Sequence, residues 1–379
     1  MVNNIAIIRS SAFKTTRVIR QAKELVNTGR NVTIIHWERM IDKEHNDNVI
    51  AALDFDCQVV SYNRRCEYGK GIYSFLDRLG WFIFLLKSVC FGKFNIVQAV
   101  DFDSAFPAFL ASKFKGNKFV YDIADFIETF DSNIPSFVRT MVRKLSSIIV
   151  KFSDLIIIPD KNRFVNIEEH DRDKVVIVNN APNLDLNKIN FQNIDIGLLS
   201  KLNELKTNVF YYGAFNEDRA IRLFLEASKD TRLSNVNFWF AGWGALEKEV
   251  NKFNGDNVHY LGRLKQVDAL SVLSEMDCSL IFYDPAYEHN RLASPNKIFE
   301  AMAVGVPVLV SLNTSIDKLV VDENIGYACD YELEDLILTL IRVQNESQEV
   351  KAKNIKSLYR DYCWDNSAFN LREAYDRLR

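Results

Sequence analysis

The residues best suited to chemistry lie in one stretch, Asn290–Ser311, which reads NRLASPNKIFEAMAVGVPVLVS. Pro295 fits the first turn of a helix, where its missing N–H would have no partner, and Gly305 fits the end of that helix. The free N–H groups of the first turn and the helix dipole favour an anion such as a phosphate, and Lys297 adds a full positive charge. Glu300, one turn further on, can accept two hydrogen bonds from a ribose diol. This spacing predicts a site that holds a nucleoside diphosphate.

An ordinary helix is the alternative for this stretch. In that case Asn296 caps the helix, Lys297 is solvated and Glu300 is an ordinary helix carboxylate without a ligand. A lone Lys-x-x-Glu would favour this alternative. The longer pattern, and its place after a strand, favour the nucleotide interpretation.

Four aspartates follow predicted strands of the first half, namely Asp101, Asp103, Asp122 and Asp125. A carboxylate at such a place can orient an acceptor hydroxyl or accept its proton, and it can equally cap the helix that follows. We favour a catalytic role for Asp125, keep both interpretations for Asp101 and Asp103, and favour the capping role for Asp122. The five histidines form no cluster. His289, just before the Lys-x-x-Glu stretch, is expected to be a solvated loop residue, and the alternative is that it approaches the bound ligand.

Short apolar runs alternate with longer amphipathic segments along the whole chain, and this alternation is typical of a parallel α/β architecture. The predicted strands of the first half are Ile5–Ile8, Asn31–His36, Ile96–Ala99, Lys118–Tyr121, Leu155–Ile158 and Val175–Val178. Those of the second half are Val209–Tyr212, Val236–Phe240, Val258–Leu261, Ser279–Phe282, Pro307–Val310 and Tyr327–Cys329. Helices are expected between them, for example Thr16–Asn27, which stops at Gly29.

The pattern predicts two doubly wound domains that face a cleft. We place the first domain at residues 1–185, a linker at 186–206, the second domain at 207–362 and a final helix, packed back on the first domain, at 363–379. Doubly wound sheets bind ligands at the carboxyl ends of their strands. A nicotinamide dinucleotide is disfavoured, because the turn after the first strand, RSSAFKTTR, holds no glycine, and Gly242 and Gly244 lack the third glycine of that motif.

The composition is that of a globular protein, and it lacks the excess of basic residues that binding to nucleic acid requires. The 379 residues include 47 Lys and Arg against 50 Asp and Glu, a net charge of -3. The six cysteines are scattered, which favours reduced thiols in a cytoplasmic protein rather than disulfides or a zinc site. We therefore expect no nucleic acid partner and no metal ion. The longest apolar run near the N-terminus, Trp81–Leu86, is too short for a bilayer that needs about 20 residues.

The stretch SPNKIFEAMAVGVPVLVS resembles the donor-binding segment of GT-B glycosyltransferases, specifically of glycosyltransferase family 4 and its polysaccharide-assembly relatives. Weaker likenesses follow in the family's order over nearly the whole chain. They are Thr16–Val18 with the following helix and strand to Arg39, Ile96–Ser104, Val120–Asp125, Val209–Gly213, Phe240–Gly244, Asn257–Arg263 and the closing YCWDNSAFNLREAYDRL.

This resemblance implies a retaining, metal-independent transferase that takes a sugar from a nucleoside diphosphate sugar. In it Glu300 would hold the ribose, and the amides of Asn296, Lys297 and Ile298 would hold the diphosphate, with Ser294 in the same segment. Gly213 and Ala214 would let the backbone approach the phosphate, and Arg263 and Leu264 would lie near the base. No other cofactor is implied, since Lys297, the helix dipole and the amides do the work that Mg²⁺ does elsewhere.

The chain departs from the family pattern at three places. Leu292 stands where a first Glu is common, Ala124 where a His often meets the donor sugar, and Ala214 where an Arg is common. For Arg219 two interpretations stay open: it stands in for that Arg, or it is a solvated helix residue. Two alternatives therefore stay open beside the transferase: a sugar-nucleotide-binding subunit without turnover, and a GT-B sugar-nucleotide epimerase.

Two segments of the first half, Phe75–Phe94 and Phe137–Phe152, mix bulky apolar and basic residues. We expect core-facing helices with a basic outer face. The alternative is that they lie on anionic lipid, which would suit the 25 basic and 22 acidic side chains of residues 1–185. Family relatives build lipid-linked glycans at the cytoplasmic face of the membrane. The resemblance thus implies a glycan or lipid-linked acceptor and a cytoplasmic protein that associates with this membrane face.

Overall fold

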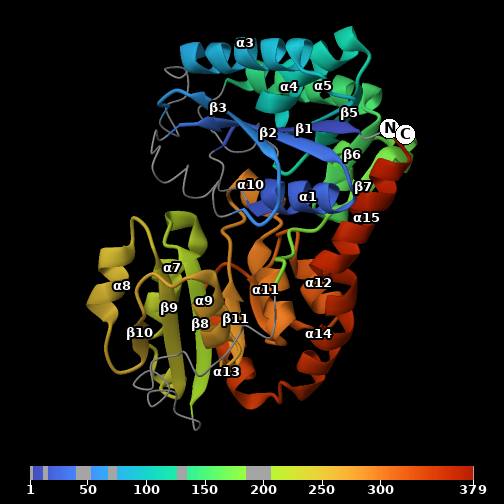
Figure 1. The fold of residues 1–379 in the computed structure, drawn as a ribbon. Helices are drawn as coiled ribbons and strands as arrows, with labels where there is room; N and C mark the ends of the chain where they lie inside the picture. The colour runs from blue at the N-terminus through green and yellow to red at the C-terminus, as the bar shows by residue number, and fades with distance from the viewer. Residues whose placement is uncertain are drawn as a thin grey trace. The chain divides into compact units, whose positions relative to one another are not determined.

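A computed structural model describes residues 3–11, 16–39, 53–66, 75–125, 135–184 and 206–378. The chain divides into two compact units. The first comprises Met1–Asn179 and Asp365–Arg379, and the second comprises Asn180–Trp364. Each unit is a parallel sheet between helices (Figure 1). The sequence had placed the end of the first domain at residue 185, and the expected linker at 186–206 lies outside the described residues except for Lys206.

The first unit contains a seven-stranded parallel sheet in the order β3-β2-β1-β4-β5-β6-β7. The strands are β1 (Asn4–Arg9), β2 (Asn31–Glu38), β3 (Gln58–Asn63), β4 (Ile96–Val100), β5 (Lys118–Asp122), β6 (Leu155–Ile158) and β7 (Val175–Ile177). All six strands predicted for this half are present. The edge strand β3 was missed, because it is only partly buried and has no continuous apolar run.

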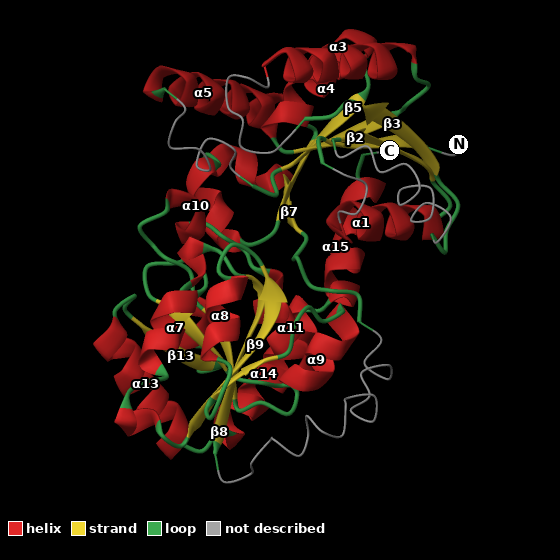
Figure 2. Ribbon diagram, turned by 90° about the vertical axis from the view of Figure 1, so that its left-hand side faces the viewer, coloured by secondary structure: helices red, strands yellow, loops and turns green. Residues whose placement is uncertain are grey.

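The helices of the first unit cover both faces of this sheet. They are α1 (Thr16–Asn27), α3 (Phe75–Phe91), α4 (Phe102–Lys115), α5 (Ser136–Phe152) and most of α15 (Trp364–Asp376), with short 3₁₀ helices at Lys161–Asn166 and Glu169–Lys174. Figure 2 shows α3, α4 and α5 on one side of the strands and α1 on the other. Residues of α15 return to this unit as the sequence predicted, since Arg30 pairs with Asp376 at 2.8 Å and Tyr375 donates to Gln98.

A buried ion pair joins α1 to the centre of this sheet. The Arg17 guanidinium donates to both carboxylate oxygens of Asp122, the shortest distance being 2.8 Å, and Gln21 and Gln98 donate to the same carboxylate at 3.0 and 3.1 Å. Arg17 also donates to the carbonyl of Val178. Asp122 is fully buried, and both of its carboxylate oxygens have hydrogen-bond partners. Its role is therefore structural, but it binds the side chains of Arg17, Gln21 and Gln98 instead of capping a helix as the sequence favoured.

The outer helices of this face correct one expectation from the sequence. We expected apolar residues of Phe137–Phe152 to face the core and its basic residues to face the solvent. In α5, however, Phe137, Met141, Ile148 and Phe152 are exposed, while Ile149 and Val150 are buried. The helix therefore carries apolar residues on both its inner and its outer face.

The second unit contains a six-stranded parallel sheet in the order β10-β9-β8-β11-β12-β13. The strands are β8 (Thr207–Ala214), β9 (Val236–Trp243), β10 (Val258–Tyr260), β11 (Cys278–Ile281), β12 (Val308–Ser311) and β13 (Gly326–Cys329). The helices are α7 (Ile221–Ala227), α8 (Glu247–Phe253), α9 (Gln266–Leu273), α10 (Glu288–Arg291), α11 (Asn296–Val304), α12 (Asp317–Asp322), α13 (Leu333–Asn345) and α14 (Glu349–Tyr362), with 3₁₀ turns at Glu217–Arg219 and Thr231–Leu233. Two large apolar clusters pack against the sheet.

Gly242 serves the contact between β8 and β9 rather than a cofactor. Its φ is +155°, and a Cβ atom at this position would stand 1.8 Å from the carbonyl oxygen of Gly213 on the paired strand. A side chain cannot fit there without moving the backbone. This close approach accounts for a glycine at the end of β9 without any dinucleotide.

Candidate functional site

Helix α11 begins directly after Pro295, which is its N-cap rather than a residue of its first turn as the sequence predicted. Pro295 is extended, with φ -71° and ψ 132°, and the helix runs from Asn296 until Gly305 ends it in the left-handed region at φ +80°. A second detail of the prediction is wrong: the N–H of Ile298 is not free, because it donates to the carbonyl of Pro295 at 3.3 Å. Among the described residues, the N–H groups of Asn296 and Lys297 have no acceptor. These two amides remain available to an anion.

Lys297 projects from this first turn toward the end of β8. Its Nζ lies 4.4 Å from the ring centre of Tyr211 and 5.6 Å from that of Tyr212. Gly213 has a φ of +128°, and a Cβ atom there would stand 2.6 Å from this Nζ. Gly213 thus leaves the space that the lysine head occupies. Burial, and next the positive charge of Arg219, lower the pKa of Lys297 to about 7, against an opposing effect of Glu300.

Arg219 is held in place by the adjacent Asp218 and by two residues far away in the sequence. Its Nη1 donates to the carboxylate of Asp218 at 2.5 Å and to the Oδ1 of Asn290 at 2.8 Å, and its guanidinium stacks on the ring of Tyr283 at 4.1 Å. Asn290 is fully buried and also donates to Asp218. Arg219 is therefore an anchored, partly buried cation whose charge acts on Lys297, and the solvated alternative is wrong.

Glu300 lies one turn after Lys297 and is almost fully buried. The hydroxyl of Tyr212 donates to its Oε2 at 2.6 Å, and the amide of Gln266 donates to its Oε1 at 2.5 Å. Burial and the neighbouring carboxylate raise the pKa of Tyr212 well above its ordinary value, so this hydroxyl stays a donor. Each carboxylate oxygen keeps a lone pair for a further donor such as a ribose hydroxyl.

Gln266 and Tyr212 are site residues that sequence reasoning missed. Gln266 is the first residue of α9 and lies two residues after Leu264, which the resemblance places near the base together with Arg263. That adjacency was the available signal for Gln266. Tyr212 sits inside a buried strand, where an aromatic residue gives no sign of a polar role.

The remaining predicted donor residues lie around this group in the second unit. The Arg263 guanidinium stacks at 4.1 Å on the ring of Trp243, which is 46% exposed, and Leu264 packs against an apolar cluster. The carbonyl of Ala214 accepts from the Tyr211 hydroxyl at 2.7 Å, and that of Ser294 accepts from Asn180 at 3.1 Å.

His289 belongs to the same unit and is partly buried. Its Nε2 lies 3.3 Å from the carboxylate of Asp218, the residue that also holds Arg219. This histidine is therefore more ordered than the solvated loop residue expected from the sequence. The imidazole of His289 and the guanidinium of Arg219 thus contact the same carboxylate.

The three predicted catalytic aspartates come together at the carboxyl edge of the first unit's sheet. The N–H of Asp125 donates to the Oδ1 of Asp101 at 2.8 Å, and Asp103 is the second residue of α4, where it accepts from Ser10. Asp101 has a φ of +61°, a strained value for a residue with a side chain, and its carboxylate makes no cap to α4. Such strain is found where neighbours over-determine a functional geometry.

Three arginines line the same edge. Arg9 lies 3.5 Å from the carboxylate of Asp101, Arg39 lies 3.8 Å from that of Asp103, and Arg163 lies 3.6 Å from that of Asp125. The pKa of Asp101 is nevertheless raised to about 7, first by burial and then by the neighbouring carboxylates, against the charge of Arg9. A carboxyl that titrates near neutral pH is suited to accept a proton from a hydroxyl.

A metal centre is not evident in the part of the chain that the structure describes. Within those residues, no group of three or more His, Cys, Asp or Glu side chains is arranged to hold an ion. The aspartate group of the first unit is included in that statement. Its carboxylates face arginines and backbone amides.

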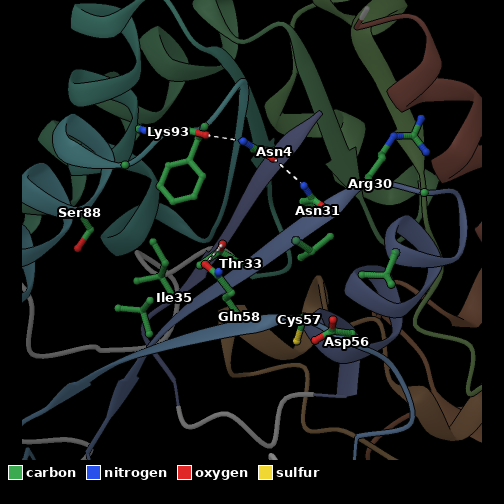
Figure 3. Close-up of a pocket in the computed structure, with 16 residues that line it drawn as sticks. Asn4, Arg30, Asn31, Thr33, Ile35, Asp56, Cys57, Gln58, Ser88 and Lys93 are labelled. Atoms are coloured by element: carbon green, nitrogen blue, oxygen red, sulfur yellow. Dashed lines mark hydrogen bonds between the residues drawn. The ribbon is translucent and has the colours of Figure 1, made fainter. Parts of the chain in front are cut away.

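A large pocket of about 840 Å³ lies at the opposite, amino edge of the first unit's sheet (Figure 3). It is lined by apolar, polar and some charged side chains around Asn4 and Asn31, and the side-chain amide of Asn4 donates to the carbonyl of Lys93 at 3.0 Å. None of the predicted catalytic or donor-binding residues lines it. We therefore place the candidate site at the Lys297 group of the second unit and the aspartate group of the first unit rather than in this pocket.

Comparison with known proteins identifies the class of this chain. Residues 206–345, which hold the whole Lys297 and Arg219 group, match the family model described as glycosyl transferases group 1. The chain is a glycosyltransferase with the GT-B fold. A search of curated protein sequences finds no match to it.

Solved structures share the fold of this glycosyltransferase over nearly its full length. Sucrose-phosphate synthase from Thermosynechococcus elongatus has a TM-score of 0.74 at 14% identity and covers 99% of each chain. Anabaena HepE in complex with UDP has a TM-score of 0.71 at 12% identity, with 99% of this chain and 100% of that chain covered. A Listeria monocytogenes protein assigned as a UDP-N-acetylglucosamine 2-epimerase has a TM-score of 0.68 at 14% identity, with 99% and 96% covered.

Proposed function

We propose that this glycosyltransferase moves a sugar from a nucleoside diphosphate sugar to a glycan or lipid-linked acceptor in cell-surface polysaccharide synthesis. One observation carries the proposal: the ammonium group of Lys297 lies at Gly213, where the charge of Arg219 contributes to lowering its pKa, and Glu300 follows one helical turn later. Two cations and two helix amides suit a diphosphate, and a buried carboxylate one turn away suits a ribose diol.

The proposed chemistry uses the chain's own charges on the leaving group. As the bond between the sugar and the diphosphate breaks, negative charge grows on the diphosphate, and Lys297 and Arg219 stabilise it. No divalent metal is required in this proposal, and the sugar keeps its anomeric configuration. The neighbours crystallised with UDP and with UDP-glucose support a nucleotide sugar as the donor.

We assign the acceptor to the first unit. Asp101 is the candidate base for the acceptor hydroxyl, and Asp125 and Asp103 are its partners at the same sheet edge. The aspartates would orient the hydroxyl and remove its proton as the new glycosidic bond forms. The protein is proposed to work in the cytoplasm, in peripheral contact with the membrane face where lipid-linked acceptors are exposed.

The first test is a thermal-shift panel of UDP, GDP, ADP, CDP and NAD, each with and without EDTA. A ligand at 100 times its Kd stabilises the folded protein by about 2.7 kcal/mol, which is a clear rise in Tm. We expect one nucleoside diphosphate to stabilise the protein equally in both conditions. Stabilisation by NAD alone, by none of the five, or only without EDTA would overturn the proposal.

The epimerase alternative rests on the likeness to the Listeria structure and on the Asp218–His289 pair, whose carboxylate also contacts Arg219. Both enzymes would bind a nucleotide sugar, so binding does not separate them. Incubation with the donor alone does: an epimerase converts the sugar, whereas a transferase needs an acceptor. A chain that binds the nucleotide and turns over neither substrate is the binding subunit.

A further inference from the structure

The outer faces of α3, α4 and α5 carry large apolar side chains in the solvent. On α5, Phe137, Met141, Ile148 and Phe152 are between 47% and 72% exposed. Their spacing of four, seven and four residues keeps them on one stripe of the helix. Isolated exposed apolar residues are ordinary in soluble proteins, but a stripe of them along a whole helix is typical of an interaction surface.

The neighbouring helices extend this outer surface. On α3 the exposed apolar residues are Leu76, Leu79, Ile83 and Phe91, and on α4 they are Leu110 and Phe114. Phe91 and Phe114 are 85% and 87% exposed at the ends of their helices, which are tied together by a bond from Lys115 to the carbonyl of Gly92. Figure 2 shows the three helices as one layer on the same side of the sheet. We call their exposed side the outer helix face.

The inner sides of these helices already have partners. Trp81, Leu85 and Val89 of α3 are buried, and the Tyr121 hydroxyl of β5 bonds to Ser146 of α5 at 3.1 Å. The core of the first unit is thus complete without the outer stripe. The exposed apolar residues are not a core that awaits a further helix of the described chain.

The charge of the outer helix face is strongly one-sided. The sequences of α3, α4 and α5 hold eight basic residues and two acidic ones, and α5 has no acidic residue. The basic residues are Arg78, Lys87, Lys113, Lys115, Arg139, Arg143, Lys144 and Lys151. Of the acidic residues, Asp77 pairs with Arg64, and Asp103 belongs to the aspartate group. Of the basic residues, Lys113 pairs with Asp154 at 3.5 Å.

Apolar stripes among cations match an anionic lipid surface. Large apolar side chains enter the boundary between headgroups and acyl chains, and lysines and arginines beside them contact the phosphates. A second copy of this face would instead bring two layers with the same excess of basic residues together, so charge disfavours a symmetric dimer here. No helix in the described part of the chain is long and apolar enough to span a bilayer.

We propose that the outer helix face docks this protein on the surface of an anionic bilayer, with the helices parallel to the membrane plane. This inference rests on the proposed function in one respect: docking would keep the first unit, to which we assign the acceptor, near lipid-linked acceptors. It assigns the peripheral contact to named helices of the first unit.

The test is co-sedimentation of the full chain with vesicles of phosphatidylcholine alone and of phosphatidylcholine with 30% phosphatidylglycerol, a composition of roughly one anionic lipid in three. We expect binding to the anionic vesicles only. The double variant Met141→Ser, Ile148→Ser should lose at least about tenfold in partitioning, since it removes two apolar insertions. Lys144→Glu, which changes two units of charge, should lose roughly 30-fold.

Matched controls come from the second unit. Leu338 and Val350 are 48% and 60% exposed there, so Leu338→Ser with Val350→Ser removes similar apolar surface elsewhere, and Lys248→Glu reverses an exposed lysine. Both controls should bind as the unchanged protein does. Absence of binding to anionic vesicles, equal loss in the controls, or a dimer that the α5 variants dissociate would each overturn the proposal.

The nucleotide panel separates this inference from the proposed function. The α5 variants should keep the full nucleotide-induced rise in Tm, which also shows that they fold. Vesicle binding without any nucleotide binding would contradict the proposed function and support the docking surface. Nucleotide binding without vesicle binding would do the reverse.

Discussion

Lys297 is expected to take up a proton when a nucleotide sugar binds. Its head lies beside Tyr211 and in the space left at Gly213, and burial and the charge of Arg219 lower its pKa to about 7. A diphosphate placed against the lysine favours the charged form. Affinity should therefore fall as the pH rises above 7.

The size of this effect follows from the lowered pKa. Well below pH 7 the free lysine is already charged, so binding carries no protonation cost. At pH 9, two units above the pKa, about 1% of the free protein holds the charged lysine, so Kd should be about 100-fold higher than on the acidic plateau. That ratio corresponds to about 2.7 kcal/mol. Without the shift, a lysine at its ordinary value would leave Kd flat over this range.

Isothermal titration calorimetry between pH 6 and 9 measures this dependence. The ligand should be a nucleotide sugar such as UDP-glucose, whose esterified diphosphate does not itself titrate in this range. Buffers with different ionisation enthalpies report the protons taken up. Lys297→Arg keeps its charge and should bind with little pH dependence, and Lys297→Met should bind weakly at every pH. Equal Kd values at pH 6 and pH 9 in the unchanged protein, with no proton uptake, would refute the reasoning.

Three further predictions address other residues. Glu300→Ala should weaken nucleotide binding by about 1–3 kcal/mol in the same titration, because the ribose loses a buried acceptor. Asp101→Asn should lower the transfer rate by about 10²–10⁴-fold. In the unchanged protein, the rate at saturating donor should rise with pH up to about 7 and then level, because the carboxyl with the raised pKa must be ionised to act as a base. Asp122→Ala should lower the free energy of unfolding by about 3–5 kcal/mol in urea, because it leaves Arg17 buried without its carboxylate.

Exposed carboxylates serve as controls for these variants. Glu275→Ala should leave nucleotide affinity unchanged, and Asp256→Ala should leave the free energy of unfolding unchanged. A folded Glu300→Ala variant with full affinity would contradict the ribose placement. A rate that ignores pH between 6 and 8, or a fully active Asp101→Asn variant, would remove Asp101 from the mechanism. An Asp122→Ala variant as stable as the unchanged protein would mean that the ion pair contributes nothing net.

Much of the fold could be predicted because its signals are local. Strands buried on both faces of a parallel sheet form continuous apolar runs, and each predicted run overlaps an observed strand. Pro295 and Gly305 marked the ends of α11 by the missing N–H of one and the left-handed backbone of the other. The edge strand β3, which is half-exposed, has no such run and was missed.

The candidate site was predicted only in part. Lys297 and Glu300 share one helix, so their separation by one turn was readable from the sequence. Arg219 and Asn290 are 71 positions apart, and Arg17 and Asp122 are 105 positions apart. Such pairs meet only because the order of strands in each sheet brings their elements together. Sequence spacing alone left Arg219 undecided and gave no sign of Tyr212.

The orientation of the apolar residues of α5 also separates what the sequence determines from what the tertiary structure decides. The period of α5 determined that its apolar residues form stripes, because side chains three and four positions apart share a side of any helix. Which stripe meets the sheet depends on how the helix packs, and only the tertiary structure decided that Ile149 faces inward and Met141 outward. The sequence by itself thus determined the elements and the spacing within each. The tertiary structure decided which side chains meet, since burial and pairing depend on neighbours distant along the chain.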